Sequence, residues 1–387
     1  MDGPWRLSGL KVNEVDEPAW ERFASGAELE FSLDYLRYAD AAGQGDRVLV
    51  TAWDDRSHRI VGAMPVTRVS RASFWLSRPA AVLGGQVADG SATLESAYED
   101  ALYPAVSVRN ICDASPLITA PGRERAAILS ALVDQVIAQA KDWGMRSVTF
   151  LPVSAEDAAL RTVLERRGFA AATYTADAFI DLRGAKTVDD YLGTLSRRRR
   201  GNARNEISRF RRDGFSVAEA DIDALPVIVA QEADTWARHG DPIGFDRLWQ
   251  LRAPLAQHLA GRRRLLVCTD SADQVVACAI HLIGRDRYHC FTYGVSYPAR
   301  QGVYANLTFY EPAAYAIAHG QSRLMLGDTT LHAKALRGAA IRPLQAYTLA
   351  FHADGTAFYR DLGERLGDQV RKEIGAAAEA TLGKSIR

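Results

Sequence analysis

NLTFYEPAAYAIAHGQSRLMLGD, residues Asn306–Asp328, reads as an alanine-rich helix that ends at Gly320 and runs directly into a strand. Glycine suits the position after a helix because that residue takes a positive φ. RAAILSALVDQVIAQAKDWGMRSVTFLP, residues Arg125–Pro152, has the same plan, with Gly144 in the corresponding place. A helix followed at once by a strand, twice in one chain, predicts a mixed α/β fold with an internal repeat.

A hairpin precedes each of these helices. RVLVTAWDDRSHRIVGAMPVTRV (Arg47–Val69) and RRLLVCTDSADQVVACAIHLIG (Arg263–Gly284) each place two apolar runs around a short polar turn, which is typical of antiparallel strand pairs. The glycines are offset by 320 − 144 = 176 residues, and the pair Arg167-Gly168 by 337 − 167 = 170 from Arg337-Gly338. Two such segments can also arise by chance in a mixed α/β chain, so divergent duplication is a hypothesis.

The 387 residues exceed one ordinary domain, and we expect two. The boundary is predicted near TYTADAFIDLRGAKTVDDYL, giving an N-terminal domain over 1–176 and a C-terminal domain over 177–387. Thr187 is the expected N-cap of an Arg-rich helix over 187–213, with Asp189 and Asp190 in its first turn. No linker rich in Pro, Ser or Gly separates the halves.

Composition indicates a soluble globular protein, with 48% hydrophobic residues and 47 basic against 47 acidic side chains. The N-terminus lacks a signal-peptide pattern and no apolar run is long enough to span a bilayer, so we expect a cytoplasmic protein. We expect its four cysteines to be buried free thiols, since none forms a CxxC pair. No metal is expected, and the motifs GxSxG, GxxxxGK[ST] and GxGxxG are absent.

LSRRRRGNARNEISRFRRDG, residues Leu195–Gly214, holds eight arginines between Arg197 and Arg212, with Glu206 as its single acid before Asp213. An apolar stripe is expected to dock this helix, while Arg197, Arg200, Arg204 and Arg211 share a second face. Such a single-sign cluster favours a phosphate-bearing ligand, since arginine binds phosphate oxygens in bidentate fashion. A solvated helix whose arginines pair with acids elsewhere is the alternative. The stripe residues are Leu192, Leu195, Ala203, Ile207 and Phe210.

The hairpin–helix–strand unit used twice, together with YLGTLSRRRRGNAR, resembles the FemAB-like branch of the GNAT acyltransferase superfamily. The residues that carry the resemblance are Leu195, Ser196, Arg200 and Arg204, then Ser296-Tyr297-Pro298, the Ala313–Gly320 helix, and GDTTLHAK with Gly327, Asp328 and Lys334. The resemblance implies two tandem GNAT-like domains, each a mixed, mostly antiparallel sheet flanked by helices. It also implies an N-acyltransferase that forms an amide by direct attack of an amine.

The resemblance leaves two donors open. CoA-dependent members carry Q/R-x-x-G-x-G/A before the helix, where backbone N–H groups bind the pyrophosphate. Here YPARQGVYANL keeps Arg300, Gly302 and Ala305, but Tyr304 and Asn306 stand where close backbone approach is needed. We therefore expect aminoacyl-tRNA as the co-substrate, with acyl-CoA as the alternative and no tightly bound cofactor.

The acceptor amine is expected on a small metabolite or a peptidoglycan precursor. A non-catalytic protein that binds a phosphate-bearing ligand is a third reading of the same residues. A DNA-binding protein is disfavoured, because no helix-turn-helix or zinc spacing accompanies the basic helix. The sequence does not define the oligomeric state.

Site residues follow from the resemblance and from the chemistry of amine attack. Asp328 is the first candidate to accept the amine's proton, and Lys334 to pair with a phosphate, a carboxylate or the oxyanion. The strand Phe291–Val295 is expected beside the acyl carbonyl, with Gly294 allowing a bulge. The expected catalytic residues are Asp328, Lys334, Tyr304 and Tyr297; the donor-binding residues are Arg197, Arg198, Arg200, Arg204, Arg211 and Arg300; the pocket residues are Trp236, Arg238, Tyr293, Gly294 and Asn306.

Overall fold

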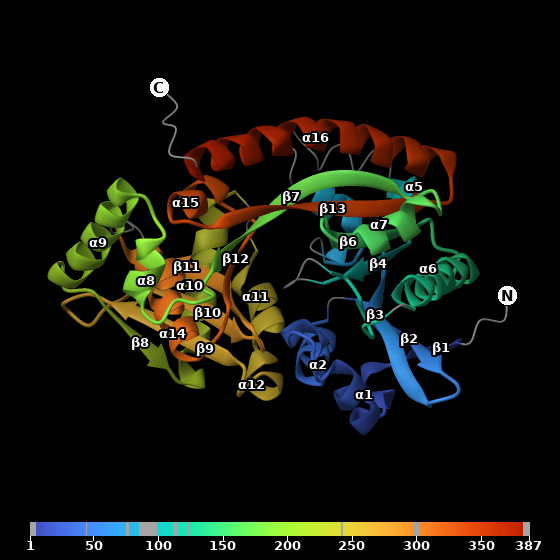
Figure 1. Cartoon of the computed structure of the whole chain (residues 1–387), viewed down its shortest axis with the longest axis horizontal. Helices are drawn as coiled ribbons and strands as arrows, with labels where there is room; N and C mark the ends of the chain where they lie inside the picture. The colour runs from blue at the N-terminus through green and yellow to red at the C-terminus, as the bar shows by residue number, and fades with distance from the viewer. Residues whose placement is uncertain are drawn as a thin grey trace. The chain divides into compact units, whose positions relative to one another are not determined.

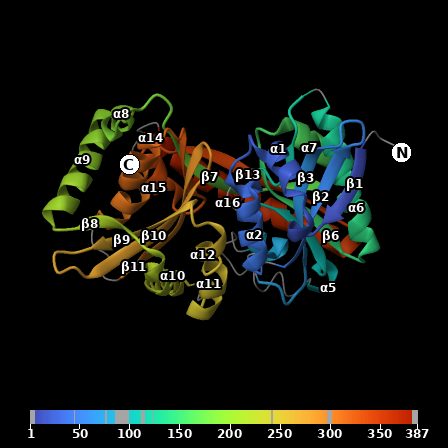
Figure 2. The same cartoon turned by 90° about the horizontal axis from the view of Figure 1, so that it is seen from below.

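The computed structural model describes residues 5–43, 45–74, 77–84, 99–110, 115–122, 124–240, 243–296 and 302–381. The chain forms two compact units. The first contains Met1–Ala176 with Arg342–Ile374, and the second contains Asp177–Ile341 with Gly375–Arg387. Figures 1 and 2 show the elements of both units along the coloured chain.

The first unit is a mostly antiparallel sheet with strand order β1-β2-β3-β4-β6-β13-β7. Only β4 and β6 in this order are shown to run parallel, and the short β5 pairs with β3. The bounds are β1 Trp5–Leu10, β2 Asp46–Asp54, β3 Arg59–Val69, β4 Ala105–Arg109, β5 Ile118–Thr119, β6 Ser147–Ser154, β7 Ala170–Asp181 and β13 Ala340–Ala350.

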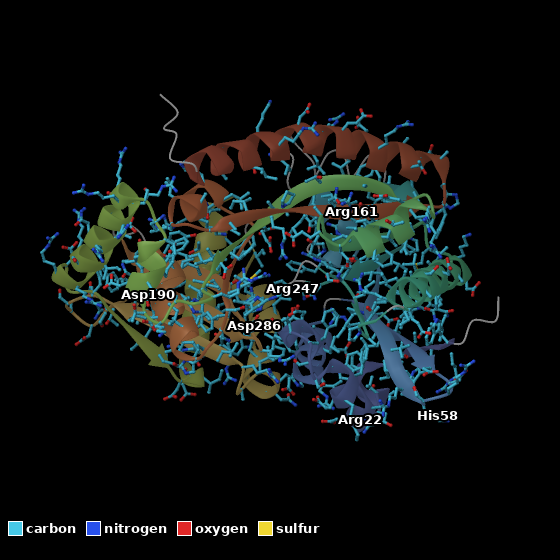
Figure 3. All side chains as sticks on the ribbon, viewed as in Figure 1. Arg22, His58, Arg161, Asp190, Arg247 and Asp286 are labelled. Atoms are coloured by element: carbon cyan, nitrogen blue, oxygen red, sulfur yellow. The ribbon has the colours of Figure 1, made fainter. Side chains whose placement is uncertain are left out.

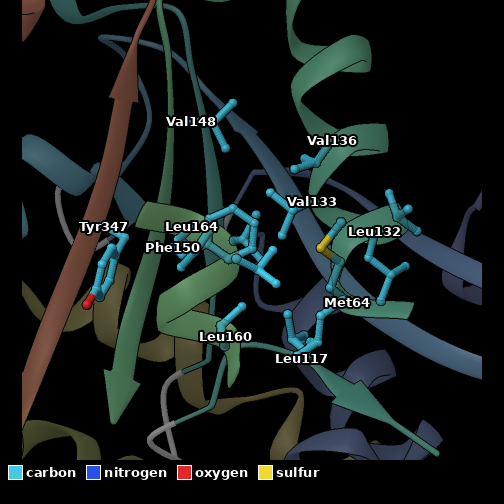
Figure 4. Close-up of a cluster of buried hydrophobic side chains, with 14 of the residues drawn as sticks. Met64, Leu117, Leu132, Val133, Val136, Val148, Phe150, Leu160, Leu164 and Tyr347 are labelled. Carbon is cyan, nitrogen blue, oxygen red and sulfur yellow. The ribbon is translucent and has the colours of Figure 1, made fainter. Parts of the chain in front are cut away.

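Helices α6 and α7 pack on this sheet over a large apolar core. Figure 4 shows side chains of α6, α7, β6 and β13 in that core, including Leu132, Phe150, Leu160 and Tyr347. Burial of this many aliphatic side chains is the main stabilising term of the unit. The helices assigned to this unit are α1 Glu17–Ala24, α2 Leu33–Ala41, α3 Pro79–Gly84, α5 Glu99–Leu102, α6 Arg125–Asp142, α7 Ala158–Glu165 and most of α16 Ala353–Thr381.

The second unit repeats the plan with strand order β7-β12-β11-β10-β9-β8, in which β11 and β12 are the parallel pair. Its strands are β8 Ser216–Ala220, β9 Arg263–Thr269, β10 Val275–Ile283, β11 Arg287–Val295 and β12 Arg323–Gly327, with residues 177–181 of β7. Its helices are α8 Val188–Gly193, α9 Arg197–Arg212, α10 Leu225–Arg238, α11 Phe245–Arg252, α12 Leu255–His258, α13 Val303–Ala305, the π-helical turn η5 Asn306–Tyr310, α14 Glu311–Ala318 and α15 Leu331–Leu336.

The predicted repeat is confirmed in both units. Each hairpin turn is closed by an aspartate side chain: Asp54 accepts the Arg56 N–H at 3.0 Å, and Asp270 accepts the Ala272 N–H at 2.9 Å. Both helix-to-strand junctions place a glycine at positive φ, +67° at Gly144 in the first unit and +72° at Gly320 in the second. The same local chemistry therefore builds the hairpin–helix–strand unit twice.

Two helices replace the single helix expected over 187–213. Thr187 caps α8 as predicted, in a reciprocal capping box with Asp190. Helix α8 ends at Gly193, and Ser196, the residue before α9, has φ −57° and ψ 153°, outside the helical region. Leu195 lies in this break and packs against Gly338, where a Cβ would come within 2.5 Å of the leucine side chain. Figures 1 and 2 show α8 and α9 as separate helices.

The assignment of the C-terminal residues to the two units differs from the expected domains, 1–176 and 177–387. Residues 342–374 lie with the first unit, because β13 pairs with β6 and α16 contributes Phe358, Tyr359 and Leu362 to a core that includes Leu102. Over the described residues, no helix combines the length and apolar character needed to cross a lipid bilayer.

Candidate functional site

The two parallel strands of the second unit, β11 and β12, pair over only part of their length. Their ladder pairs Arg287 with Arg323 and continues only to His289 and Met325. Beyond this point β11 continues to Val295 along β10, whereas β12 shifts register and pairs Gly327 with Ala178 of β7. Successive N–H groups of a strand alternate between its two sides. This part of β11 therefore presents backbone groups to the gap between the strands.

Lys334 of α15 is buried at the end of this gap. It is 2% exposed, and its Nζ donates a hydrogen bond to the Gly327 carbonyl at 3.2 Å. Burial lowers the pKa of the Lys334 ammonium from 10.5 to about 8, and the negative charges of Asp328 and Asp177 partly oppose that shift. A lysine with such a pKa is a better proton donor near neutral pH than an exposed lysine.

Asp328 and Cys290, which both influence Lys334, have different characters. Asp328 follows β12 directly and is exposed. The Cys290 thiol of β11 donates to the Thr308 carbonyl at 3.3 Å, and burial raises its pKa to about 12. Cys290 therefore remains a thiol at neutral pH and is no candidate nucleophile. Among the described cysteines, Cys268 and Cys278 are buried and free, as predicted; Cys112 lies outside the described residues.

The tyrosines predicted near the site form an aromatic group on one side of it. The Tyr304 hydroxyl lies 3.2 Å from Thr330 Oγ1, and its ring meets Tyr293 edge-on at 5.1 Å. Burial raises the pKa of Tyr304, so its hydroxyl is a donor at neutral pH. Asn306 Nδ2 donates to the Gly302 carbonyl at 2.8 Å. Tyr297 and Arg300 lie outside the described residues.

The arginines of α9 divide into anchored and exposed groups. Arg199 reaches the Ala335 carbonyl at 3.5 Å, and the exposed Arg204 pairs with Asp189 at 3.0 Å. Arg200 is half-buried, and its Nη2 donates to the Leu195 carbonyl at 3.3 Å. Figure 3 shows nitrogen-tipped side chains extending outward from this helix. Helix α9 is described over its whole length, and three of its arginines are exposed with no side-chain hydrogen-bond or ion-pair partner: Arg197, Arg198 and Arg211.

Glu206, the single acid within α9, holds the helix beside the site. It accepts two hydrogen bonds from Arg337, Nη2 to Oε1 at 2.7 Å and Nε to Oε2 at 3.2 Å. The Tyr310 hydroxyl donates to the same carboxylate at 2.5 Å, and Tyr191 donates to the Arg337 carbonyl at 2.6 Å. Sequence reasoning noted Glu206 only as a lone acid and missed this network. Because Arg337 directly follows α15, the network joins the arginine helix to the helix that carries Lys334.

Two predicted pocket residues belong to a different cluster. Trp236 Nε1 lies 3.4 Å from Glu232 Oε1 within α10, and Glu232 is paired with Arg252 of α11 at 2.6 Å. Arg238 is exposed at the end of α10. The structure therefore places Trp236 and Arg238 with the α10–α11 helices, whereas Tyr304 contacts Thr330, just before α15, and Tyr293 packs against Tyr304.

Gly294 lies in β11 as predicted but forms no bulge. It pairs regularly with Cys278, and the register shift between β10 and β11 falls at Ile280/His281. A Cβ at Gly294 would come within 2.7 Å of the Gln231 and Glu232 backbone of α10. Glycine is required there because a helix backbone crosses the strand at close range.

Comparisons with known proteins agree with this architecture. The family model of the acetyltransferase (GNAT) domain matches residues 197–335. The crystal structure of FemX covers 92% of this chain and 100% of its own, with a TM-score of 0.63 at 11% identity. A tandem GNAT protein from the clavulanic acid biosynthesis pathway, solved without AcCoA, covers 89% and 98%, with a TM-score of 0.52 at 13% identity. No curated protein matches the sequence.

These likenesses concern the fold. They confirm the predicted resemblance to the FemAB-like branch and the predicted class of two tandem GNAT-like domains. The chain has the fold of a GNAT-type acyltransferase, and the described strand gap and Lys334 lie within or beside the segment that the family model matches.

Proposed function

We propose that the chain is an N-acyltransferase that moves an aminoacyl group from aminoacyl-tRNA to an amine of a small metabolite or a peptidoglycan precursor. The observation that supports this most directly is the set of exposed arginines on α9, Arg197, Arg198 and Arg211, which we call the arginine row. Helix α9 is anchored beside the gap between β11 and β12 that holds Lys334. An arginine surface at a GNAT-type site favours a donor that brings several phosphates.

The length of the arginine row favours a nucleic acid over CoA. Arg197 and Arg211 are 14 residues apart, which corresponds to about 21 Å along a helix. Each strand of a nucleic-acid duplex places a phosphate about every 3.4 Å along its axis. The three phosphates of a CoA lie much closer together than the two ends of this row. A polyanion can contact the whole row at once.

The start of the α13 helix also disfavours CoA. In CoA-dependent relatives the pyrophosphate lies on N–H groups at this helix start. Here the Glu206 carbonyl oxygen of α9 lies 3.6 Å from the position of a Cβ on Gly302, and Asn306 Nδ2 lies 3.9 Å from it. An oxygen with negative partial charge beside the helix start opposes an anion there.

The site residues supply the groups that aminolysis of an ester requires. The neutral acceptor amine attacks the ester carbonyl carbon, so that a C–N bond forms and the C–O bond to the ribose breaks. Asp328 receives the proton that the amine loses, and the Lys334 ammonium donates a proton to the leaving ribose oxygen. Backbone N–H groups of β11 in the gap stabilise the oxyanion. Solvent then removes the proton from Asp328 and returns one to Lys334.

The donor is tested by giving the protein a pool of radiolabelled aminoacyl-tRNAs and, separately, acyl-CoAs, with cell extract as the source of acceptors. We expect consumption of aminoacyl-tRNA that stops after RNase treatment. Lys334→Met should lower the rate about 10²- to 10⁴-fold, as for loss of a general acid. Thiol release from acyl-CoA would instead show that the chain is an acyl-CoA-dependent enzyme. No transfer from either donor would favour the third reading, a non-catalytic protein that binds a phosphate-bearing ligand.

The role of the arginine row is tested by the salt dependence of tRNA binding. Each of Arg197→Ala, Arg198→Ala and Arg211→Ala should weaken binding and reduce the slope of log K against log salt by about 1. Arg183→Ala is the control, since Arg183 is exposed in the turn after β7 and pairs with Asp181. Equal effects of all four substitutions would show that α9 is not the binding surface.

A further inference from the structure

Thr330, the residue before α15, has a backbone conformation that threonine rarely adopts. Its φ is +52° and its ψ is 40°, in the left-handed region. Within the described part of the chain, two other non-glycine residues have positive φ, His58 and Asp273. Both lie in the turns of hairpins, and both are of residue types that tolerate this region. Threonine is β-branched, so its conformation here costs free energy.

The start of α15 does not account for this conformation of Thr330. A threonine before a helix usually has an extended backbone and accepts an N–H of the first turn with its hydroxyl, as Thr187 does at α8. The Thr330 hydroxyl caps no N–H of α15. Its side chain is also exposed, so burial does not hold the residue. The left-handed backbone must therefore be held by contacts with neighbouring groups.

Lys334 closes the short segment Gly327–Thr330 at both ends. The Lys334 backbone N–H donates to the Thr330 carbonyl at 3.3 Å, and its Nζ donates to the Gly327 carbonyl at 3.2 Å. Asp328 lies between these two carbonyls in the chain. Because φ and ψ of Thr330 set the direction of its carbonyl, they set where α15 begins. The strained residue therefore determines how Lys334 lies relative to Asp328.

The Thr330 hydroxyl is connected to the gap strand through Tyr304. The two hydroxyl oxygens lie 3.2 Å apart, within hydrogen-bond distance. The Tyr304 ring is itself held between two aromatic rings that meet it edge-on, Tyr293 of β11 at 5.1 Å and Phe309 of η5 at 5.7 Å. The start of α15 is thus attached to β11 by one hydrogen bond and one ring contact.

We propose that Thr330 and Tyr304 are positioning residues. The hydrogen bond between their hydroxyls holds the left-handed backbone of Thr330, and that backbone fixes Lys334 and Asp328 beside the strand gap. Strain of this kind is a known way to pre-organise a site. The catalytic part of this role rests on the proposed acyl transfer. The attachment of α15 does not, and it can be tested without any substrate.

The first test separates the strain from the hydrogen bond by melting temperature. Thr330→Val keeps the branched shape and removes the hydroxyl, so it should melt below the wild type. Thr330→Gly removes the strain as well, so it should melt above Thr330→Val. Tyr304→Phe should lower the melting temperature of the wild type more than that of Thr330→Gly, which lacks the partner hydroxyl. An equal effect in both backgrounds would overturn the proposed hydrogen bond.

The second test titrates Lys334 in the whole protein by NMR after labelling with ¹³C-lysine, with Lys334→Met identifying its signal. Thr330→Gly should loosen the segment and let water reach the ammonium, so that the pKa of Lys334 rises from about 8 toward 10.5. The substitution removes no charge, so a moved midpoint reports a moved ammonium. Thr330→Ser keeps the hydroxyl and should titrate like the wild type.

Asp273→Gly is the matched control, since it also replaces an exposed residue of positive φ by glycine, in the turn between β9 and β10. It should leave the Lys334 titration unchanged. An unchanged titration in a folded Thr330→Gly variant, or an equal change in Asp273→Gly, would overturn the proposal.

The third test measures transfer once a donor is known. Thr330→Gly should lower kcat about 10- to 100-fold with little change in KM, because it misplaces the reacting groups without removing them. Thr330→Ser should retain most of the activity. If the titration moves as expected but no donor is used, the proposed function fails and the attachment of α15 through Thr330 stands. Wild-type kcat in Thr330→Gly would overturn the catalytic part of the role.

Discussion

Lys334 lowers the stability of the fold while it carries its charge, because its ammonium is buried between strands. Its pKa is about 8 in the folded chain against 10.5 ordinarily. Between these values the unfolded chain binds more protons than the folded chain, so the free energy of unfolding must rise with pH. Relative to Lys334→Met, the wild type should gain roughly 2.5 kcal/mol between about pH 7 and pH 10.

Urea unfolding of both proteins at the two pH values measures this gain. Lys141→Met provides the control, since Lys141 is an exposed residue in the last turn of α6. The difference in free energy of unfolding between Lys141→Met and the wild type should not change over the same pH range. If the difference in free energy of unfolding between the wild type and Lys334→Met stays constant with pH, the lowered pKa of Lys334 is contradicted.

Single residues were predictable where a motif marked them. Lys334 and Asp328 stand in GDTTLHAK, and the structure places both beside the strand gap. Asp177 was not predictable, because it is one polar residue in a strand whose register with β12 follows only from the folded sheet. Glu206 was visible as a lone acid among arginines, but its partner Arg337 is 131 residues away in the chain.

The Glu206–Arg337 pair is a largely buried polar attachment of helix α9. Glu206 and Arg337 are both largely buried in a bidentate contact, and such pairs are costly to break from one side. Glu206→Gln should lower the free energy of unfolding by about 1 to 3 kcal/mol. Hydrogen exchange in α9 should rise at the same time, since the helix loses the charge of a bidentate attachment.

The matched control is Asp189→Asn, which removes the exposed pair with Arg204. That pair is open to solvent on both sides, so its loss should cost less than about 1 kcal/mol. Comparable losses from both variants would show that burial of the Glu206–Arg337 pair contributes nothing extra.

Two glycines of the second unit should respond to alanine with opposite sign. Gly201 lies inside α9 with open space around its missing Cβ, so Gly201→Ala should stabilise the chain by about 0.5 to 1 kcal/mol. Gly294→Ala would force a Cβ to within 2.7 Å of the α10 backbone, and should destabilise by about 1 to 3 kcal/mol. Thermal unfolding of both variants measures the sign of the stability change. If Gly294→Ala stabilised the chain, α10 would have to shift away from β11 at no cost in stability.

Elements were predictable where local chemistry defines them. The hairpins, the helix-ending glycines and the Thr187 cap all follow from residues next to one another. The break between α8 and α9 was not predictable, because the arginine and leucine pattern around Leu195 is compatible with a continuous helix. Leu195, in the break, packs against Gly338, a contact between distant residues that local sequence does not reveal.

At the scale of the whole molecule, the first unit is completed by residues that follow the second repeat in the chain. Residues 342–374 supply β13, which pairs with β6, and α16, whose apolar face joins a core of the first unit. Local patterns cannot reveal such pairing, since any strand of suitable alternation fits the same edge. The predicted boundary at 176 therefore describes the order of the repeats along the chain rather than the composition of each compact unit.

A fragment ending at residue 176 tests this arrangement. Without residues 342–374, β6 exposes an unpaired edge and the core around Leu102 and Leu151 loses the apolar face of α16. Both changes favour aggregation over a folded monomer. We expect fragment 1–176 to show little cooperative thermal unfolding, and the same fragment joined by a flexible linker to residues 342–374 to recover it. The joined segment must restore both the missing strand and the apolar helix face, so a linked variant with Phe358→Ser and Leu362→Ser should remain uncooperative. Cooperative unfolding of 1–176 by itself would show that the N-terminal repeat forms a complete core without the C-terminal segment.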